Sequence, residues 1–267
     1  MKTSNSLALA VSVAFAASSH AQLLISEYLA NPAGTDSPFE FVELIATKNI
    51  DFSTTPFSVV FANNGTATPN GWIAGADLTY GFNITAGSVA RGDVVYVGGS
   101  SMAPTGTKLR VINTATTPGD GFGNAAAGVL GNGGANADGI AVFNGSVGSL
   151  TPATVPIDAI FFGTGVGASA VSGGTEGYEL PNNDHYSGGK LQANSFVAAD
   201  PPSAQYTVAS GAYDDSSDTW INPRTFTLTP TLTDGSSSVV LVPEPGTWTV
   251  LGLGFLGVIC QLRRKQP

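Results

Sequence analysis

The 267-residue chain contains little cysteine, little histidine and few positive charges. A single cysteine, Cys260, excludes a disulfide within the chain. The long central part has a single histidine, His185, whereas a zinc site of three histidines would need more. Ten Lys and Arg against 19 Asp and Glu give a net charge of −9. Because an acidic surface repels phosphate groups, we expect no nucleic-acid partner, and the sequence indicates no cofactor.

Long helical patterns are also missing between residues 22 and 242. Gly, Ser, Thr, Asn and Pro instead separate short runs rich in Val, Ile and Phe, which is typical of strands joined by turns. These runs predict an all-β fold, and their spacing favours an antiparallel sandwich. The expected strands are Leu23–Leu29, Phe39–Ile45, Ser58–Ala62, Leu78–Ile84, Val94–Gly98, Lys108–Asn113, Gly139–Phe143, Ile157–Phe162, Gln205–Ala209 and Thr225–Leu228.

The first 21 residues have the pattern of a secretory signal peptide. Lys2 precedes an apolar run from Leu7 to Ala17, and Ser19-His20-Ala21 places small residues around one position before Gln22. We expect signal peptidase to cut between Ala21 and Gln22 and the protein to be exported. A buried N-terminal helix is the alternative.

The other end of the chain is a short apolar segment followed by three basic residues. Trp248 to Leu262 would span about 22 Å as a helix, which is less than the roughly 30 Å of a bilayer core. Arg263, Arg264 and Lys265 fit retention on the cytoplasmic side. A marginal span of this kind favours a temporary anchor in the inner membrane. The side chains expected to face lipid are Trp248, Leu251, Leu253, Phe255, Leu256, Val258 and Ile259.

Pro243-Glu244-Pro245 stands just before this segment. The two prolines keep the backbone extended, so a protease could grip the tripeptide. Together with the apolar helix and the basic end, this motif resembles the PEP-CTERM sorting signal of Gram-negative bacteria. The resemblance implies cleavage by the membrane protease exosortase and transfer to the cell surface or extracellular matrix. An ordinary C-terminal membrane tail is the alternative.

The pattern Gly252-x-Gly254-x-x-Gly257 lacks the βαβ context of a dinucleotide site and indicates helix packing.

The central part resembles lamin-tail domains through the order of several weak motifs. These are LLISEYLANPAGTDSPFEFVELIAT, Ile50–Ser53, Ile84–Gly87, Asp93–Gly98, Asn136–Phe143 and Ile157–Gly163. Phe41 stands where that family usually has tryptophan, and Thr54-Thr55 replaces its Gly-Trp pair. The resemblance implies an immunoglobulin-like antiparallel β-sandwich with loop insertions.

Four regions follow from these patterns. They are a signal peptide (1–21), a lamin-tail-like sandwich (22–163), an additional β and loop region that either joins or extends that domain (164–242), and a sorting signal with a C-terminal hydrophobic helix (243–267).

Candidate catalytic and metal-binding residues are few. His185 follows Asp184 and could be a general base, although such clusters more often form turns. Glu176 and Glu179 could be a glycosidase pair, whereas Glu40 and Glu43 should point to opposite faces of a strand and be solvated. Calcium could bind to Asp214, Asp215 and Asp218, although these residues lack the EF-hand spacing. The Asn132–Gly139 loop matches that spacing only in fragments. The sequence therefore does not decide whether the protein binds a metal ion.

The combined patterns favour a non-catalytic secreted or cell-surface protein of a matrix or biofilm. Its partners would be signal peptidase, exosortase, the inner membrane for a limited time, and an extracellular polysaccharide. The alternatives are an extracellular hydrolase and a carbohydrate- or calcium-binding adhesion module.

Overall fold

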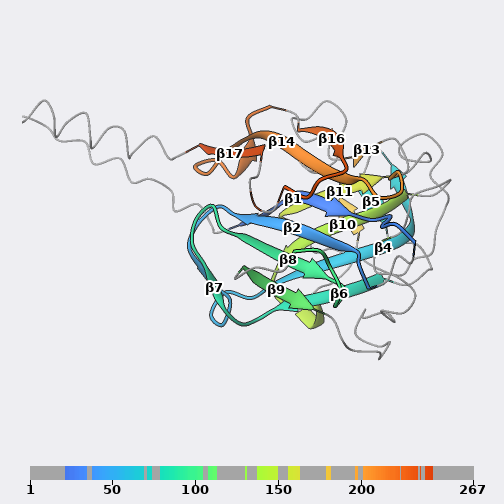
Figure 1. Ribbon diagram of the computed structural model, residues 1–267. Helices are drawn as coiled ribbons and strands as arrows, with labels where there is room; N and C mark the ends of the chain where they lie inside the picture. The colour runs from blue at the N-terminus through green and yellow to red at the C-terminus, as the bar shows by residue number, and fades with distance from the viewer. Residues whose placement is uncertain are drawn as a thin grey trace, which may run out of the picture.

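The structure is a computed structural model that confirms the all-β prediction (Figure 1). In the part of the chain that it describes, the only helix is a short 3-10 turn at Val147–Ser149. The described residues are 22–34, 38–68, 71–73, 79–104, 108–112, 130, 137–149, 156–162, 179–181, 196–197, 201–222, 224–233, 235 and 238–242.

Two large sheets face each other in a sandwich-like arrangement (Figure 1). The first sheet has the order β15 (Thr219–Trp220), β14 (Tyr206–Asp214), β1 (Leu23–Leu29), β2 (Phe41–Ala46), β8 (Val94–Gly98), β9 (Leu109–Ile112), with β16 (Thr225–Thr229) and β17 (Ser238–Val242) also paired to β14. The second has the order β12 (Glu179–Pro181), β5 (Gly71–Ile73), β4 (Phe57–Thr68), β10 (Ala137–Asn144), β11 (Asp158–Phe162), β13 (Phe196–Val197), with β6 (Thr79–Ile84) paired to β4. A small third sheet joins β3 (Ile50–Asp51) and β7 (Ser88–Val89).

The expectation of an antiparallel sandwich holds for most strand pairs but not for all of them. Among the described strands, three pairings are parallel, namely β8 with β9, β11 with β13 and β14 with β17. Parallel neighbours need a long connection between strands, which alternation within each strand cannot reveal. The sandwich is therefore mixed.

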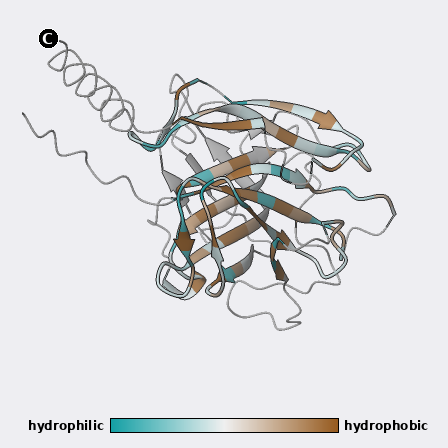
Figure 2. Ribbon diagram, turned by 60° about the vertical axis from the view of Figure 1, so that its left-hand side comes forward, coloured by the Kyte–Doolittle hydropathy of each residue, from teal (hydrophilic) through white to brown (hydrophobic). Residues whose placement is uncertain are grey.

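The main core lies between the two sheets. Leu23, Ile25 and Val42 of the first sheet share one buried cluster with side chains of β4, β10 and β11. Tyr28 stacks on Phe162 across the sheets, with ring centroids 5.1 Å apart. Figure 2 shows the alternation of hydrophobic and hydrophilic segments along the strands that produces this face.

A second apolar cluster covers the outer face of the first sheet. Leu24, Phe41 and Tyr96 pack there against Trp220 and Val239 of the C-terminal strands. Both faces of β1 and β2 are thus covered, and all residues of these two strands are buried. This explains why β1 opens with a continuous apolar run instead of strict alternation.

A β-bulge at Ser26 sets which side chains of β1 face the core. Ile25 pairs with Leu44 and Glu27 with Glu43, so Ser26 is the extra residue. The bulge shifts the alternation by one position, which places Tyr28 rather than Glu27 in the core between the sheets.

Several sequence predictions concern residues outside those that the structure describes. The signal peptide with Ala21, the motif Pro243-Glu244-Pro245, and the segment from Trp248 to Lys265 belong to this group. Within the described ranges, no helix is both long and apolar enough to cross a bilayer.

Candidate processing site

The last described residues before the proline motif belong to a strand of the folded sheet. β17 runs parallel to β14 over five pairs, from Ser210–Ser238 to Asp214–Val242. Val239 is buried in the outer cluster, whereas Val240 is 60% exposed. The chain therefore enters Pro243 directly from a paired strand.

β1 pairs with only the first part of one edge of β14, and β17 pairs with the rest of that edge. β1 pairs with β14 only through Glu27 and Tyr28, next to the bulge. Beyond the bulge, the amide of Ile25 donates instead to the Asp158 carboxylate of the second sheet at 2.7 Å. Residues 210–214 of β14 then pair with β17.

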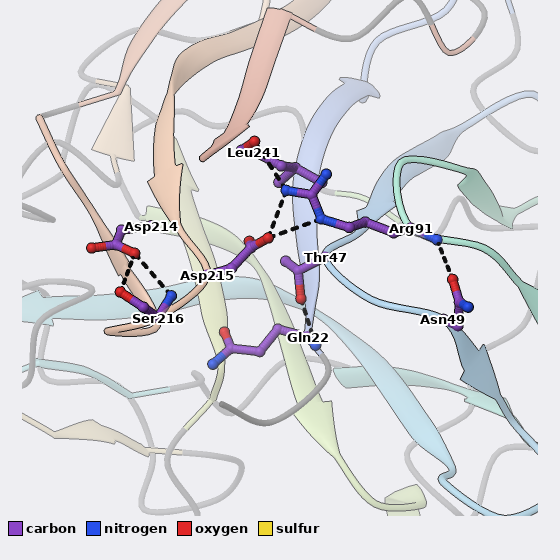
Figure 3. Close-up of polar contacts among 8 residues, drawn as sticks. All are labelled: Gln22, Thr47, Asn49, Arg91, Asp214, Asp215, Ser216 and Leu241. Atoms are coloured by element: carbon purple, nitrogen blue, oxygen red, sulfur yellow. Dashed lines mark hydrogen bonds and ion pairs between the residues drawn. The ribbon is translucent and has the colours of Figure 1, made fainter. Parts of the chain in front are cut away.

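Arg91 clamps the end of β17 to the body (Figure 3). Its Nε and Nη2 donate to Oδ2 of Asp215 at 2.9 and 2.7 Å, and Nη2 also donates to the carbonyl of Leu241 at 2.9 Å. The backbone amide of Arg91 donates to Oδ1 of Asn49 at 2.9 Å, which fixes the turn that carries the arginine. The amide of Asp215 donates to the carbonyl of Val242 at 3.3 Å. Both residues that precede Pro243 are thus held.

Asp215 is buried although Arg91 is partly exposed, with side-chain exposures of 4% and 40%. Burial raises the pKa of Asp215, and the Arg91 hydrogen bond and charge oppose that rise only in part. Its neighbour Asp214 behaves in the opposite way, because the hydroxyl and amide of Ser216 donate to it and lower its pKa (Figure 3).

Gln22, the first residue after the predicted signal-peptide cut, is also fixed. Its amide donates to Oγ1 of Thr47 at 3.1 Å, and its carbonyl accepts from the Thr47 amide at 3.0 Å. Its side-chain Oε1 accepts from the hydroxyl of Tyr213 at 2.6 Å. Tyr213 lies two residues before Asp215, so the two candidate processing ends lie close to one another on the folded body.

The loop that leads into β17 is held by two buried carboxylates. Glu27 accepts from the amide and hydroxyl of Thr233, and Glu43 accepts from the amide of Gly235 at 2.9 Å. Glu43 also accepts from Tyr96 Oη at 2.6 Å and Ser26 Oγ at 2.7 Å. The bulge explains this arrangement, since it turns Ser26 and Glu27 together toward Glu43.

The prediction that Glu40 and Glu43 are solvated is wrong. Both are completely buried, Glu43 beneath the loop at residues 233–235 and Glu40 with its carboxylate 3.3 Å from the amide of Leu130. Their different partners agree with the expectation that the two side chains point to opposite faces. They do not form a catalytic pair.

A fully buried ion pair connects the C-terminal region to both sheets. Arg224 and Asp158 are fully buried and lie 2.8 Å apart. Arg224 also donates to the carbonyl of Ala159 at 3.0 Å, and its guanidinium lies 4.6 Å from the ring centre of Trp220. Residues from both sides of position 163 thus share one sheet and one buried pair.

The described residues do not form any of the other candidate sites. His185 and Glu176 lie outside them, and Glu179 is described only as backbone in β12. No group of three or more metal-ligating side chains occurs among the described residues. Asp214 and Asp215 are instead engaged by Ser216 and Arg91.

The hollows on the described surface include one that is mostly apolar and one that is more polar. A mostly apolar one of ≈290 Å³ is bordered by Phe39 and Tyr206 together with Leu29, Pro32 and Pro230. Burial, helped by the charge of Glu27, raises the pKa of Tyr206. A more polar one of ≈390 Å³ includes Asp93 and Lys108.

Sequence reasoning missed Arg91, Asp215 and Arg224 as structural partners, and it missed β17. The run Ser238–Val242 has the Val-rich composition of a strand and could have been recognised, but long-range ion pairs leave no local pattern.

Comparison with known families places the PEP-CTERM protein-sorting motif at residues 241–265. Its first two residues are therefore the clamped end of β17. No characterised protein and no solved structure matches the chain significantly. The motif implies exosortase-dependent sorting to the cell exterior.

Proposed function

We propose that the protein is a non-catalytic module of the cell surface or extracellular matrix, exported with a signal peptide and released from a transient inner-membrane anchor by exosortase. The observation that carries this proposal is the sorting motif at residues 241–265, which follows directly on a folded, acidic β body. The order of strand motifs from Leu23 to Gly163 favours a lamin-tail-like, immunoglobulin-like sandwich for that body. The net negative charge of the chain favours solubility outside the cell.

The decisive experiment follows the full-length chain in a Gram-negative host that encodes an exosortase. We expect external material whose intact mass lacks both the first 21 residues and the segment from Trp248 onward. Replacing Pro243-Glu244-Pro245 with three alanines should leave an uncut, membrane-bound precursor. External material that retains Trp248 to Pro267 would contradict transient anchoring, and so would wild-type processing in a strain without exosortase.

A carbohydrate-binding adhesion module is the second candidate, because the hollow beside Phe39 and Tyr206 offers aromatic surface with a nearby polar hydroxyl. Calorimetric titration of residues 22–242 with soluble glycans and with calcium separates the two. A heat of binding that is measured with the wild type and is absent with the Tyr206→Ala variant would favour the binding module. Activity on polysaccharide that is lost in Glu176→Gln or Glu179→Gln would favour a hydrolase.

A further inference from the structure

The cut site lies very close to the folded body. Leu241 and Val242 are held by Arg91 and by the Asp215 amide, so the paired structure extends at least to Val242. Only five residues, 243 to 247, separate Val242 from Trp248, where the apolar segment begins. Even fully extended, five residues reach at most about 18 Å. Any membrane protease that cuts in this connection must therefore meet the body itself.

The surface that it would meet is the corner around the end of β17, which we call the clamp corner. It consists of Asn49, Arg91, Val240 and Leu241, and the buried carboxylate of Asp215 holds Arg91 from beneath. Val240 is 60% exposed, although the neighbouring Val239 is buried, so an apolar side chain stands free on the strand just before the motif. Arg91 adds a partly exposed positive charge to a body that carries few of them.

We propose that the clamp corner is a docking surface for the processing protease, so that the folded body and not the motif alone is its substrate. This proposal rests on the proposed function, since it takes exosortase as the partner. The clamp has two effects. It fixes the position of the cut site relative to the body, and it presents Val240 and Arg91 beside that site. A chain whose last strand is not yet paired would lack this surface and would be cut slowly.

The first test lengthens the connection. Inserting fifteen Gly and Ser residues after Val242 in the full-length chain extends the connection fourfold without touching the clamp. Effective concentration falls with about the −3/2 power of length, so conversion of precursor should slow by about eightfold. The same insertion after Gly148, which has open space around it, leaves the sorting motif intact and serves as the control.

The second test changes the surface. Val240→Ser should slow conversion several-fold, whereas Leu228→Ser, which alters a similarly exposed apolar side chain on β16, should not. Arg91→Ala should slow it as well, and Arg110→Ala, whose guanidinium donates to the Met102 carbonyl instead, should not. Circular dichroism of residues 22–242 verifies that each variant folds. If Arg91→Ala unfolds, Val240→Ser and the insertion decide.

Pulse-chase conversion of precursor to external product is the readout. Wild-type rates for the insertion after Val242 and for Val240→Ser would overturn the docking surface while leaving exosortase sorting intact. A wild-type chain that never loses its C-terminal segment would instead overturn the proposed function, so the two failures are distinguishable.

Discussion

The carboxylate of Asp158 and the guanidinium of Arg224 form an ion pair of 2.8 Å in which neither side chain is exposed to solvent. Asp158 belongs to the second sheet and also accepts the amide of Ile25 from the first, while Arg224 precedes β16. One carboxylate therefore joins both sheets to the C-terminal strands. Its geometry gives the first prediction.

Asp158→Asn should lower the free energy of unfolding by about 3 to 5 kcal/mol, because it leaves the buried charge of Arg224 without a counter-ion. Urea denaturation of residues 22–242 measures this loss. The double variant Asp158→Leu with Arg224→Met should recover much of it, since it removes both charges. A single variant as stable as wild type would show that the pair lies in a more polar setting than the structure indicates.

Tyr96→Phe should lower the free energy of unfolding by about 1.5 to 3 kcal/mol, because the hydroxyl donates to the buried carboxylate of Glu43. The matched variant Tyr206→Phe removes a hydroxyl of a partly exposed tyrosine and should have a smaller effect. A double-mutant cycle with Glu43→Gln isolates the hydrogen bond. Zero coupling between the two positions would be evidence against it.

Asp215 and Asp214 should change stability with pH in opposite directions. The pKa of Asp215 is raised by burial, so its contribution is full below its unfolded pKa of 3.8 and is lost as pH rises through the folded value. The pKa of Asp214 is lowered by Ser216, so its contribution is present above pH 3.8 and is lost as pH falls.

The variants Asp215→Asn and Asp214→Asn test this pair of signs. Subtracting the unfolding free energy of each variant from that of wild type should give a difference that falls with rising pH for Asp215 and rises for Asp214. Urea titrations between pH 3 and 7 provide the data. Parallel slopes for both variants would refute the assignment.

Tyr28 and Tyr213 should resist ionisation while the protein is folded. Burial is the largest cause of the raised pKa at both, and the charges of Asp218, Asp158 and Asp215 add to it at Tyr213. Their stabilising contribution is full below pH 10 and is lost as pH rises through the raised values, so alkali should unfold the protein. Absorbance at 295 nm should show these two phenols ionising only with unfolding. Normal titration in the folded state would contradict their burial.

Gly98→Ala should lower the free energy of unfolding by about 1 to 3 kcal/mol, the usual result of overpacking a tight core. A Cβ at Gly98 would lie 2.3 Å from the carbonyl oxygen of Glu40 and 2.6 Å from Cα of Phe41. Gly148 has open space around it and provides the control, because its alanine variant should retain wild-type stability. Thermal unfolding compares the two.

Local patterns predicted the strands that depend on local composition. The expected strand at Val94–Gly98 is β8 as observed, and Ile157–Phe162 differs from β11 by one residue. The expected strand at Phe39–Ile45 overlaps β2, which begins two residues later and ends one residue later. These segments are rich in β-branched and aromatic residues, which are the residue types enriched in strands.

The predictions that failed depended on distant parts of the chain. The local sequence pattern predicts that Glu43 is solvated, but its carboxylate accepts the amide of Gly235, which lies 192 positions away. The clamp at Arg91 likewise joins residues that are 124 positions apart. Of the candidate site, the sequence predicted the sorting motif, and its composition also indicates a strand before it, but the pairing of that strand with β14 leaves no local pattern.

The pairing of β17 with β14 has a consequence for the timing of folding. Synthesis delivers residues 210–214 before residues 238–242, so this part of β14 stays an open strand edge until almost the entire chain has emerged. Open edges invite pairing with other chains. Newly made molecules are therefore most prone to aggregate in the brief interval before their final strand arrives, and a truncation that ends before Ser238 would prolong that interval indefinitely.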